Sequence, residues 1–291
     1  MKGPELRQAL SNYIDKMPPL PTSIGKILEI CQSPNAQPAD LNKVISLDPV
    51  LLARVMKLIN SAYYGLSQEV TSLVRAIIML GLNTVKNLAL STAVLGSINA
   101  ERSKDAALNL EGFWLHSICV GVTAKLIAKK RSVSPLDLEN YFFCGLLHDI
   151  GKIPLNNRAP GDYLAALRMC TVDRVPLYRA EQTALELTHC ESGALIISAW
   201  KLSEEILDVV SWHHDTVGYK GPNGDLVQTV AVADYFANIM EIGFSGNRFP
   251  VKPPSEVFRQ MGLDWQAIED LEPLVRQEIE KAKVFLKLTG S

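Results

Sequence analysis

Apolar residues recur at intervals of three and four along most of the chain, and the apolar-polar alternation typical of strands is nearly absent. Leu51, Leu52, Val55, Met56 and Ile59, for example, share one face of a helix. Because this pattern extends over most of the sequence, it predicts an all-α protein.

Residues that begin and end helices divide the first hundred positions. Asp40, Asp48, Ser72 and Asn83 are predicted N-caps, because each has a short polar side chain and precedes an apolar-periodic run. A proline follows Asp48, as is common at the first helical position. Gly81 is predicted to end the helix that Ser72 begins.

The rest of the chain predicts longer helices at 113–130, 138–149, 196–212 and 255–288. Between the last two, segment 218–224 is rich in glycine and includes a proline, which predicts a loop.

The charged segment Asn99–Asp105 is the predicted link between two halves, residues 1–105 and 106–291. Because short links favour packed neighbours, we expect a helical N-terminal bundle that packs on a second helical core.

The chain has 291 residues, of which 47% are hydrophobic, so a substantial core can form. A net charge of −2 gives no footprint for nucleic acid or an anionic membrane surface. The N-terminus lacks the apolar centre of a signal peptide, and we find no uncharged apolar run of membrane-spanning length. We therefore expect a cytoplasmic protein that binds neither nucleic acid nor membranes.

The 5 cysteines are widely spaced and include no Cys-x-x-Cys pair. They are interpreted as reduced, buried small hydrophobic residues rather than disulfide partners or zinc ligands.

Histidines and aspartates form the most informative pattern in the second half. A single histidine is more often structural than a ligand, but here a His-Asp pair, a lone histidine, a His-His pair and an aspartate follow one another. Side chains of these types, gathered from separate helices, bind iron, manganese or zinc. The pattern predicts one or two divalent ions, held by His148, Asp149, His189, His213, His214 and Asp234.

Two further roles are assigned within this set. Asp234, late in the chain, could bridge two ions. Lys152 lies one helical turn beyond His148 and Asp149, and could hold a phosphate as a point charge, although a solvated surface lysine is an equal alternative. Asp149 and Lys152 are therefore the candidate catalytic residues.

Segment 76–88 has the helix, glycine turn and helix rhythm of a DNA-binding helix-turn-helix. Its second helix offers only Lys86 as a cation, whereas a recognition helix normally carries several donors. DNA binding is therefore the weakest functional alternative.

Several N-terminal elements carry a family resemblance. Met17-Pro-Pro-Leu-Pro21, the stretch from Val44 to Gly65 with its Asp48-Pro49 and Asn60-Ser61-Ala62 elements, and the stretch from Ser72 to Gly81 resemble the HDOD domain. This bacterial signalling module is related to the HD phosphohydrolases, and the resemblance spans residues 17–214. It implies an output or adaptor module that binds signalling proteins.

The second half resembles the core of the HD-GYP and HD phosphohydrolases. Many HDOD domains lack the metal-binding residues of that core. His148-Asp149 matches the HD doublet of the phosphohydrolases, and the later ligand candidates and Lys152 match in order. The resemblance adds His116 as the first histidine of that core. It implies a phosphohydrolase or phosphodiesterase acting on a nucleotide or cyclic dinucleotide as the alternative function.

Two departures limit the enzyme interpretation. Lys220 stands where the Gly-Tyr-Pro loop of HD-GYP proteins has its proline, and Gly112 stands where some relatives with a third metal carry a carboxylate. The sequence therefore favours a protein-binding adaptor with a metal centre of at most two ions.

Overall fold

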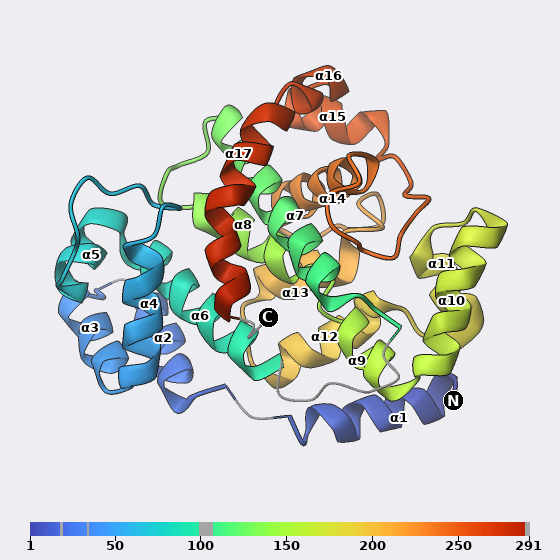
Figure 1. The fold of residues 1–291 in the computed structure, drawn as a ribbon, viewed down its shortest axis with the longest axis horizontal. Coiled ribbons are helices and arrows are strands. Elements are labelled where there is room, and N and C mark those ends of the chain that lie inside the picture. Colours follow the sequence, from blue (N-terminus) through green and yellow to red (C-terminus); the bar gives the residue numbers. More distant parts are fainter. Residues whose placement is uncertain (18–19, 34, 99–106, 289–291) are drawn as a thin grey trace.

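The computed structural model describes residues 1–17, 20–33, 35–98 and 107–288, and none of these residues forms a strand (Figure 1). The all-α prediction is confirmed. The predicted link Asn99–Asp105 lies outside the described residues.

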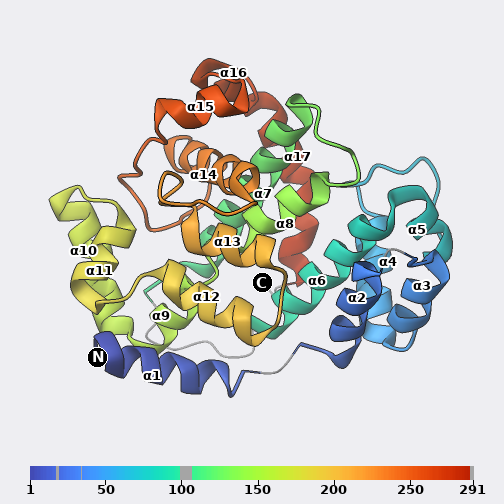
Figure 2. The same ribbon diagram turned by 180° about the vertical axis from the view of Figure 1, so that it is seen from behind.

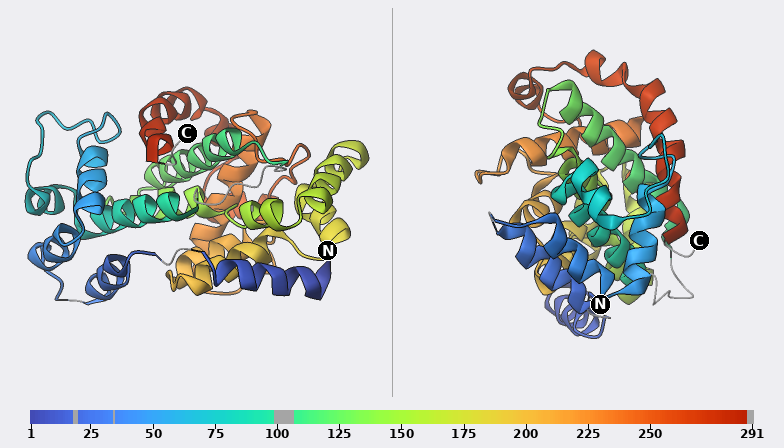
Figure 3. Two further views of the ribbon diagram at one scale, coloured as in Figure 1. Left: turned by 60° about the horizontal axis from the view of Figure 1, so that its bottom comes forward. Right: turned by 90° about the vertical axis from the view of Figure 1, so that its left-hand side faces the viewer.

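Helices of the first half form a bundle at one end of the molecule, apart from the first helix. They are α1 (Gly3–Ile14), α2 (Thr22–Gln32), α3 (Pro38–Ser46), α4 (Pro49–Ile59), α5 (Leu73–Leu80) and α6 (Leu82–Ile98). Helix α1 instead runs alongside the core, where it packs on α9 and α12 (Figure 3). Helix α6 reaches from the bundle to α8, so the bundle packs on the core as expected.

The core is built around α7 and α8. Its elements are α7 (Leu110–Lys130), α8 (Leu138–Leu147), α9 (Lys152–Arg158), α10 (Pro160–Asp173), α11 (Leu177–Leu185), α12 (His189–Ala199), α13 (Glu204–Trp212), α14 (Gly224–Ile239), α15 (Ser255–Met261), α16 (Trp265–Glu269), α17 (Glu272–Ala282) and the 3₁₀ helix η1 (Lys283–Leu288). Helix α17 crosses the face seen in Figure 1, and α12 and α13 cross the opposite face in Figure 2.

Helices α7 and α8 pass unusually close to one another because each has glycine at the crossing. A Cβ atom on Gly145 would lie 2.7 Å from the Cα atom of Gly121. This contact fixes the end of α8, where the His-Asp pair follows, against α7.

Some predicted helix ends are confirmed and others are wrong. Asp48 and Ser72 accept hydrogen bonds from the backbone of Leu51 and Arg75 at 3.0 and 3.4 Å, as N-caps do, and Gly81 ends α5 with a φ of 88°. The prediction for Asp40 is wrong.

Helix α3 begins three residues earlier than predicted, at Pro38, after the N-cap Gln37. Asp40 occupies the third helical position and accepts a hydrogen bond from the backbone N–H of Gln37 at 3.0 Å. Asn83 is also not an N-cap, because α6 begins at Leu82 directly after Gly81.

Two long predicted helices are interrupted. Segment 196–212 lies in α12 and α13, which are separated by a turn with Lys201 at a φ of 53°. Segment 255–288 divides into α15, α16, α17 and η1, with Gly262 at a φ of 66° after α15.

The helix-turn-helix-like segment forms α5 and α6. Helix α6 is largely buried, since it packs against α2, α4 and α8. It does not offer the free face that a recognition helix inserts into the major groove.

By length and composition, Leu110–Lys130 could cross a membrane, as could the bent pair Leu73–Leu80 and Leu82–Ser97 if it formed one span. Inside this fold 67% of the apolar window of Leu110–Lys130 is buried, which is the environment of a core helix.

Aromatic side chains connect the N-terminal bundle to the core. The ring of Tyr63 lies 5.4 Å from that of Phe142 on α8 and 5.5 Å from that of Phe285 on η1. The ammonium group of Lys125 donates a hydrogen bond to the Tyr63 hydroxyl at 3.0 Å and pairs with Glu139 at 2.5 Å. This cluster joins three parts of the chain that are distant in sequence.

We predict that Phe285→Ala lowers the free energy of unfolding by about 3 to 5 kcal/mol, because truncating a buried phenylalanine leaves a cavity. Leu274→Ala, at an exposed position of α17, should change it by less than about 0.5 kcal/mol. Urea unfolding followed by circular dichroism measures both. Equal effects of the two substitutions would contradict the bridging role of this cluster.

Candidate metal centre

The structure brings all seven predicted metal ligands into one region of the core. They come from α7 (His116), the turn after α8 (His148 and Asp149), the start of α12 (His189), the turn after α13 (His213 and His214) and α14 (Asp234). Six of them are buried, and His214 is partly exposed.

Their ligand atoms form two groups, and within each group all atoms lie within 4.8 Å of one another. The first group contains His116, His148, Asp149 and Asp234. The second contains His189, His213 and His214 together with Cys190, which the sequence analysis did not assign to the site.

The carboxylate of Asp149 faces both groups. Its Oδ2 atom lies 3.2 Å from Nε2 of His148, and its Oδ1 atom lies 3.2 Å from Nε2 of His189 and 3.7 Å from Nε2 of His213. Oδ1 of Asp234 instead lies 3.1 Å from Nε2 of His116, within the first group. The bridging position expected for Asp234 is therefore occupied by Asp149.

Hydrogen bonds on the other ring nitrogen orient three of the histidines. Nδ1 of His148 lies 2.7 Å from the carbonyl oxygen of Gly145, and Nδ1 of His213 lies 2.9 Å from that of Val209. Because a carbonyl only accepts, each Nδ1 carries the hydrogen. Nδ1 of His189 is likewise held by Glu181, at 2.6 Å. In the neutral ring, Nε2 then presents a lone pair, which is the arrangement of metal-binding histidines.

Several buried atoms at the centre have no hydrogen-bond partner among the described residues. They are Nε2 of His148, Nε2 of His213 and Oδ1 of Asp149. Leaving such groups unsatisfied is costly unless another partner binds them. The residues present therefore fit one or two divalent ions.

A close backbone contact brings α12 to the His-Asp turn. A Cβ atom on Gly151 would lie 1.9 Å from the carbonyl oxygen of His189 and 2.4 Å from the backbone nitrogen of Gly193. Only glycine fits here, so the glycine after the His-Asp pair is required for His189 to approach Asp149.

Lys152 is fully buried, which neither interpretation of its sequence anticipated. Its ammonium group pairs with Asp149 and donates a hydrogen bond to the carbonyl oxygen of Ser245 at 3.0 Å. It lies away from the side chains that line the neighbouring cavity. Lys152 therefore orients Asp149 and neutralises its charge, while the phosphate contact remains an untested prediction.

Burial and neighbouring charges set the protonation of the centre. Burial alone would favour neutral acids, but His148 and Lys152 hold the pKa of Asp149 well below its usual value. Burial opposes charge on His148, yet the carboxylates of Asp149 and Asp234 outweigh it and raise its pKa to about 9. Burial, with the charge of His148, lowers the pKa of His213 to about 3. Proton and cation thus compete for His148.

The space next to Gly112 is filled. A Cβ atom there would lie 2.8 Å from the Cβ atom of Phe244, whose backbone N–H donates to the Gly112 carbonyl at 2.8 Å. A carboxylate at this position would not fit beside His116, in agreement with an upper limit of two ions.

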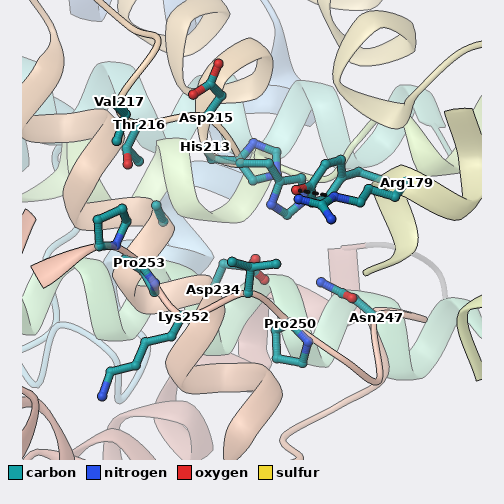
Figure 4. A pocket seen from close by; sticks show the side chains of 15 residues that line it. Arg179, His213, Asp215, Thr216, Val217, Asp234, Asn247, Pro250, Lys252 and Pro253 are labelled. Carbon is teal, nitrogen blue, oxygen red and sulfur yellow. Dashed lines mark hydrogen bonds between the residues drawn. The ribbon is translucent and has the colours of Figure 1, made fainter. Parts of the chain in front are cut away.

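A cavity of about 470 Å³ opens beside the second group (Figure 4). His213, His214 and Asp234 are among the residues that line it. Arg179 and Lys252 lie on different sides of the cavity. The Lys252 ammonium lies 5.4 Å from the centre of the Trp265 ring. Arg179 forms no ion pair with any described residue, so its guanidinium can bind an anion.

The loop after His214 forms one wall of the cavity through Asp215, Thr216 and Val217. Tyr219, from the loop compared above with Gly-Tyr-Pro, donates its hydroxyl hydrogen to Asp208 at 2.7 Å. Its side chain is held outside the cavity lining.

Three residues of the site were not predicted. Glu181 and Arg179 share α11, whose sequence carries no motif that would mark them. Cys190 directly follows His189, and this adjacency was the available signal.

Comparison with known proteins identifies the family and the fold of the chain. The HDOD domain model matches residues 17–216, and the chain belongs to the HDOD family. An uncharacterised protein of Treponema pallidum is 26% identical over 233 residues, which are 79% of this chain and 44% of that protein. The chain thus spans less than half of that relative.

Solved structures share the fold. An HDOD domain protein of unknown function from Geobacter sulfurreducens has a TM-score of 0.76 at 24% identity, over 96% of both chains. A protein of Shewanella amazonensis SB2B, provisionally assigned as a phosphohydrolase, has a TM-score of 0.70 at 25% identity, over 95% of this chain and 98% of its own.

We predict that Glu181→Gln weakens zinc binding by about 10- to 100-fold, the usual effect of removing a carboxylate that orients a ligand histidine. Glu204→Gln, at an exposed position of α13, should leave the affinity unchanged. Titration against a competing chelator measures both affinities. Equal affinity of the two variants would contradict the orienting role of Glu181.

Manganese affinity should rise with pH. Below pH 9 the raised pKa of His148 keeps its ring protonated in the metal-free protein, and a bound ion must displace that proton. The affinity should therefore increase about tenfold per pH unit for each displaced proton and level off near pH 9. Metal-buffered titrations from pH 6.5 to 8.5 test this expectation, and a constant affinity would contradict it.

Proposed function

We propose that this HDOD protein holds one or two divalent ions, iron, manganese or zinc, and hydrolyses a phosphate ester of a small molecule. The observation that carries the proposal is the convergence of imidazole Nε2 atoms on a buried carboxylate. Two of these atoms, in His148 and His213, have no hydrogen-bond partner among the described residues. The sequence alone ranks protein binding first, and we place hydrolysis first because the geometry of the centre supports it.

Ions at this centre would supply Lewis-acid activation of a phosphoryl group and lower the pKa of a bound water. The protein side chains would provide the rest. Asp149 links the two ligand groups, and Lys152 holds it in position. Arg179 offers a planar fork of donors to phosphate oxygens entering from the cavity.

The ligand proposed is a small phosphate ester rather than cyclic di-GMP. The cavity of about 470 Å³ is suited to a small ligand. The Tyr219 hydroxyl donates to Asp208, and the side chain does not line the cavity. The loop therefore lacks the ligand contacts expected from a Gly-Tyr-Pro sequence. We therefore expect weak or absent turnover of cyclic di-GMP.

A second candidate is the adaptor role expected from the family. Leu47, Val50, Ile78 and Met79 are exposed on the bundle formed by α3, α4 and α5. Exposed apolar side chains of this kind suit a signalling-protein partner. The proposed location is the cytoplasm, with neither nucleic acid nor membrane as partner.

We predict hydrolysis of bis(p-nitrophenyl) phosphate that depends on added manganese or iron, with about one to two ions bound per chain. Asp149→Ala should abolish the activity and the binding of manganese or iron at the first ligand group, because it removes a carboxylate that faces both groups. Asp173→Ala, an exposed substitution on α10, is the matched control and should behave as the wild type.

In the same assay Arg179→Ala should raise KM by about 10- to 100-fold, the loss of one charge-assisted contact of about 1.5 to 3 kcal/mol. Arg168→Ala, which replaces an exposed arginine on α10, should leave KM unchanged. Metal-loaded protein without turnover on any phosphate ester tested would leave the adaptor role as the better interpretation. Rapid turnover of cyclic di-GMP, at about one per second or more, would contradict the argument from the loop.

A further inference from the structure

Cys190 lies where a fourth protein ligand of the second group would be. Its sulfur is within 4.8 Å of the ligand nitrogens of His189, His213 and His214. Nε2 of His189 and Nε2 of His214 face each other at 3.1 Å. Nitrogen ligands of a tetrahedral zinc ion are separated by about 3.3 Å, given Zn–N distances of about 2.0 to 2.1 Å. The spacing of these two nitrogens is therefore already that of two ligands of one ion.

The position of Cys190 is fixed by the first turn of α12. Thr188 accepts a hydrogen bond from the backbone of Glu191 at 3.3 Å, and the Glu191 carboxylate accepts one from the backbone of Thr188 at 2.9 Å. This capping box holds the turn that contains both His189 and Cys190. The side chain of Cys190 is only 9% exposed.

One more feature of this group points to a bound ion. The buried Nε2 atom of His213 has no hydrogen-bond partner among the described residues, so it also requires a ligand.

We propose that Cys190 binds the second ion as a thiolate and makes this group a cysteine and three-histidine site that prefers zinc or cobalt to manganese. Thiolate sulfur is a soft ligand that selects zinc, whereas manganese prefers oxygen ligands. The first group, with two carboxylates and two histidines, has no sulfur and accepts the harder ions. The inference rests on the proposed metal centre and extends it, because it predicts two unlike ion sites.

Cobalt substitution tests the assignment without any activity assay. The full chain, freed of metal and titrated with Co²⁺, should develop thiolate-to-cobalt charge-transfer absorption in the near ultraviolet. Cys190→Ala should abolish this band and weaken zinc binding by at least about tenfold, because losing a direct ligand costs no less than losing a residue that orients one. Cys31→Ala, remote in the N-terminal bundle, should retain the band.

The outcomes separate the inference from the proposal it extends. Cobalt bound by equilibrium dialysis without the band, or a band that persists in Cys190→Ala, would overturn the assignment of Cys190 alone. Absence of cobalt binding would overturn the metal centre as well. Cys190→Ser keeps the shape of the side chain and should also lose the band. If neither variant folds, the wild-type chain is labelled with iodoacetamide with and without zinc. Zinc should slow the labelling of Cys190 but not that of Cys31. Labelling of Cys190 at the same rate with and without zinc would contradict the proposal.

Discussion

A single buried carboxylate, that of Asp149, is the constraint on which this structure depends. Removing a carboxylate from water is expensive unless charges and hydrogen bonds compensate it. Here Lys152 supplies a positive charge, and the histidines on both sides face the two oxygens. The glycines at the α7–α8 crossing and at position 151 follow from this requirement, because helices separated by ordinary side chains could not bring these groups together.

The helix ends that build the centre serve two purposes at once. His148 and His213 directly follow α8 and α13, and each holds a carbonyl oxygen in the last turn of its own helix through Nδ1. Carbonyls in the last turn of a helix often lack helical partners, although that of Val209 also accepts the backbone N–H of His213 at 3.1 Å. The same hydrogen bond fixes the tautomer that directs Nε2 into the centre. At His148 and His213, helix termination and ligand geometry are thus one interaction, whereas His116 and Asp234 lie in the interiors of α7 and α14.

The sequence predicts the helices and the metal-ligand residues better than it predicts the turns between helices and the burial of individual side chains. The sequence predicts the N-caps Asp48 and Ser72 because a cap is a local interaction. It predicts the ligand histidines because their order along the chain is itself the pattern. The break in segment 196–212 was missed, because apolar spacing continues through the turn at Lys201. The burial of Lys152 depends on the distant Ser245, which no local pattern encodes. The sequence predicts a core position for Cys190, because a thiol ligand and a small buried apolar side chain cannot be distinguished from sequence alone.

The N-terminal helix α1 packs against two of the helices that build the metal centre. Leu6 and Leu10 are fully buried where α1 packs on α9 and α12, the helices that carry Lys152 and His189. The ion pair between Arg7 and Glu191 is exposed and adds little, so apolar burial provides this contact. A protein that displaced α1 would loosen two elements of the centre, and an ion that fixed them would favour the docked helix. The burial of Leu6 and Leu10 thus supports the two helices that carry Lys152 and His189.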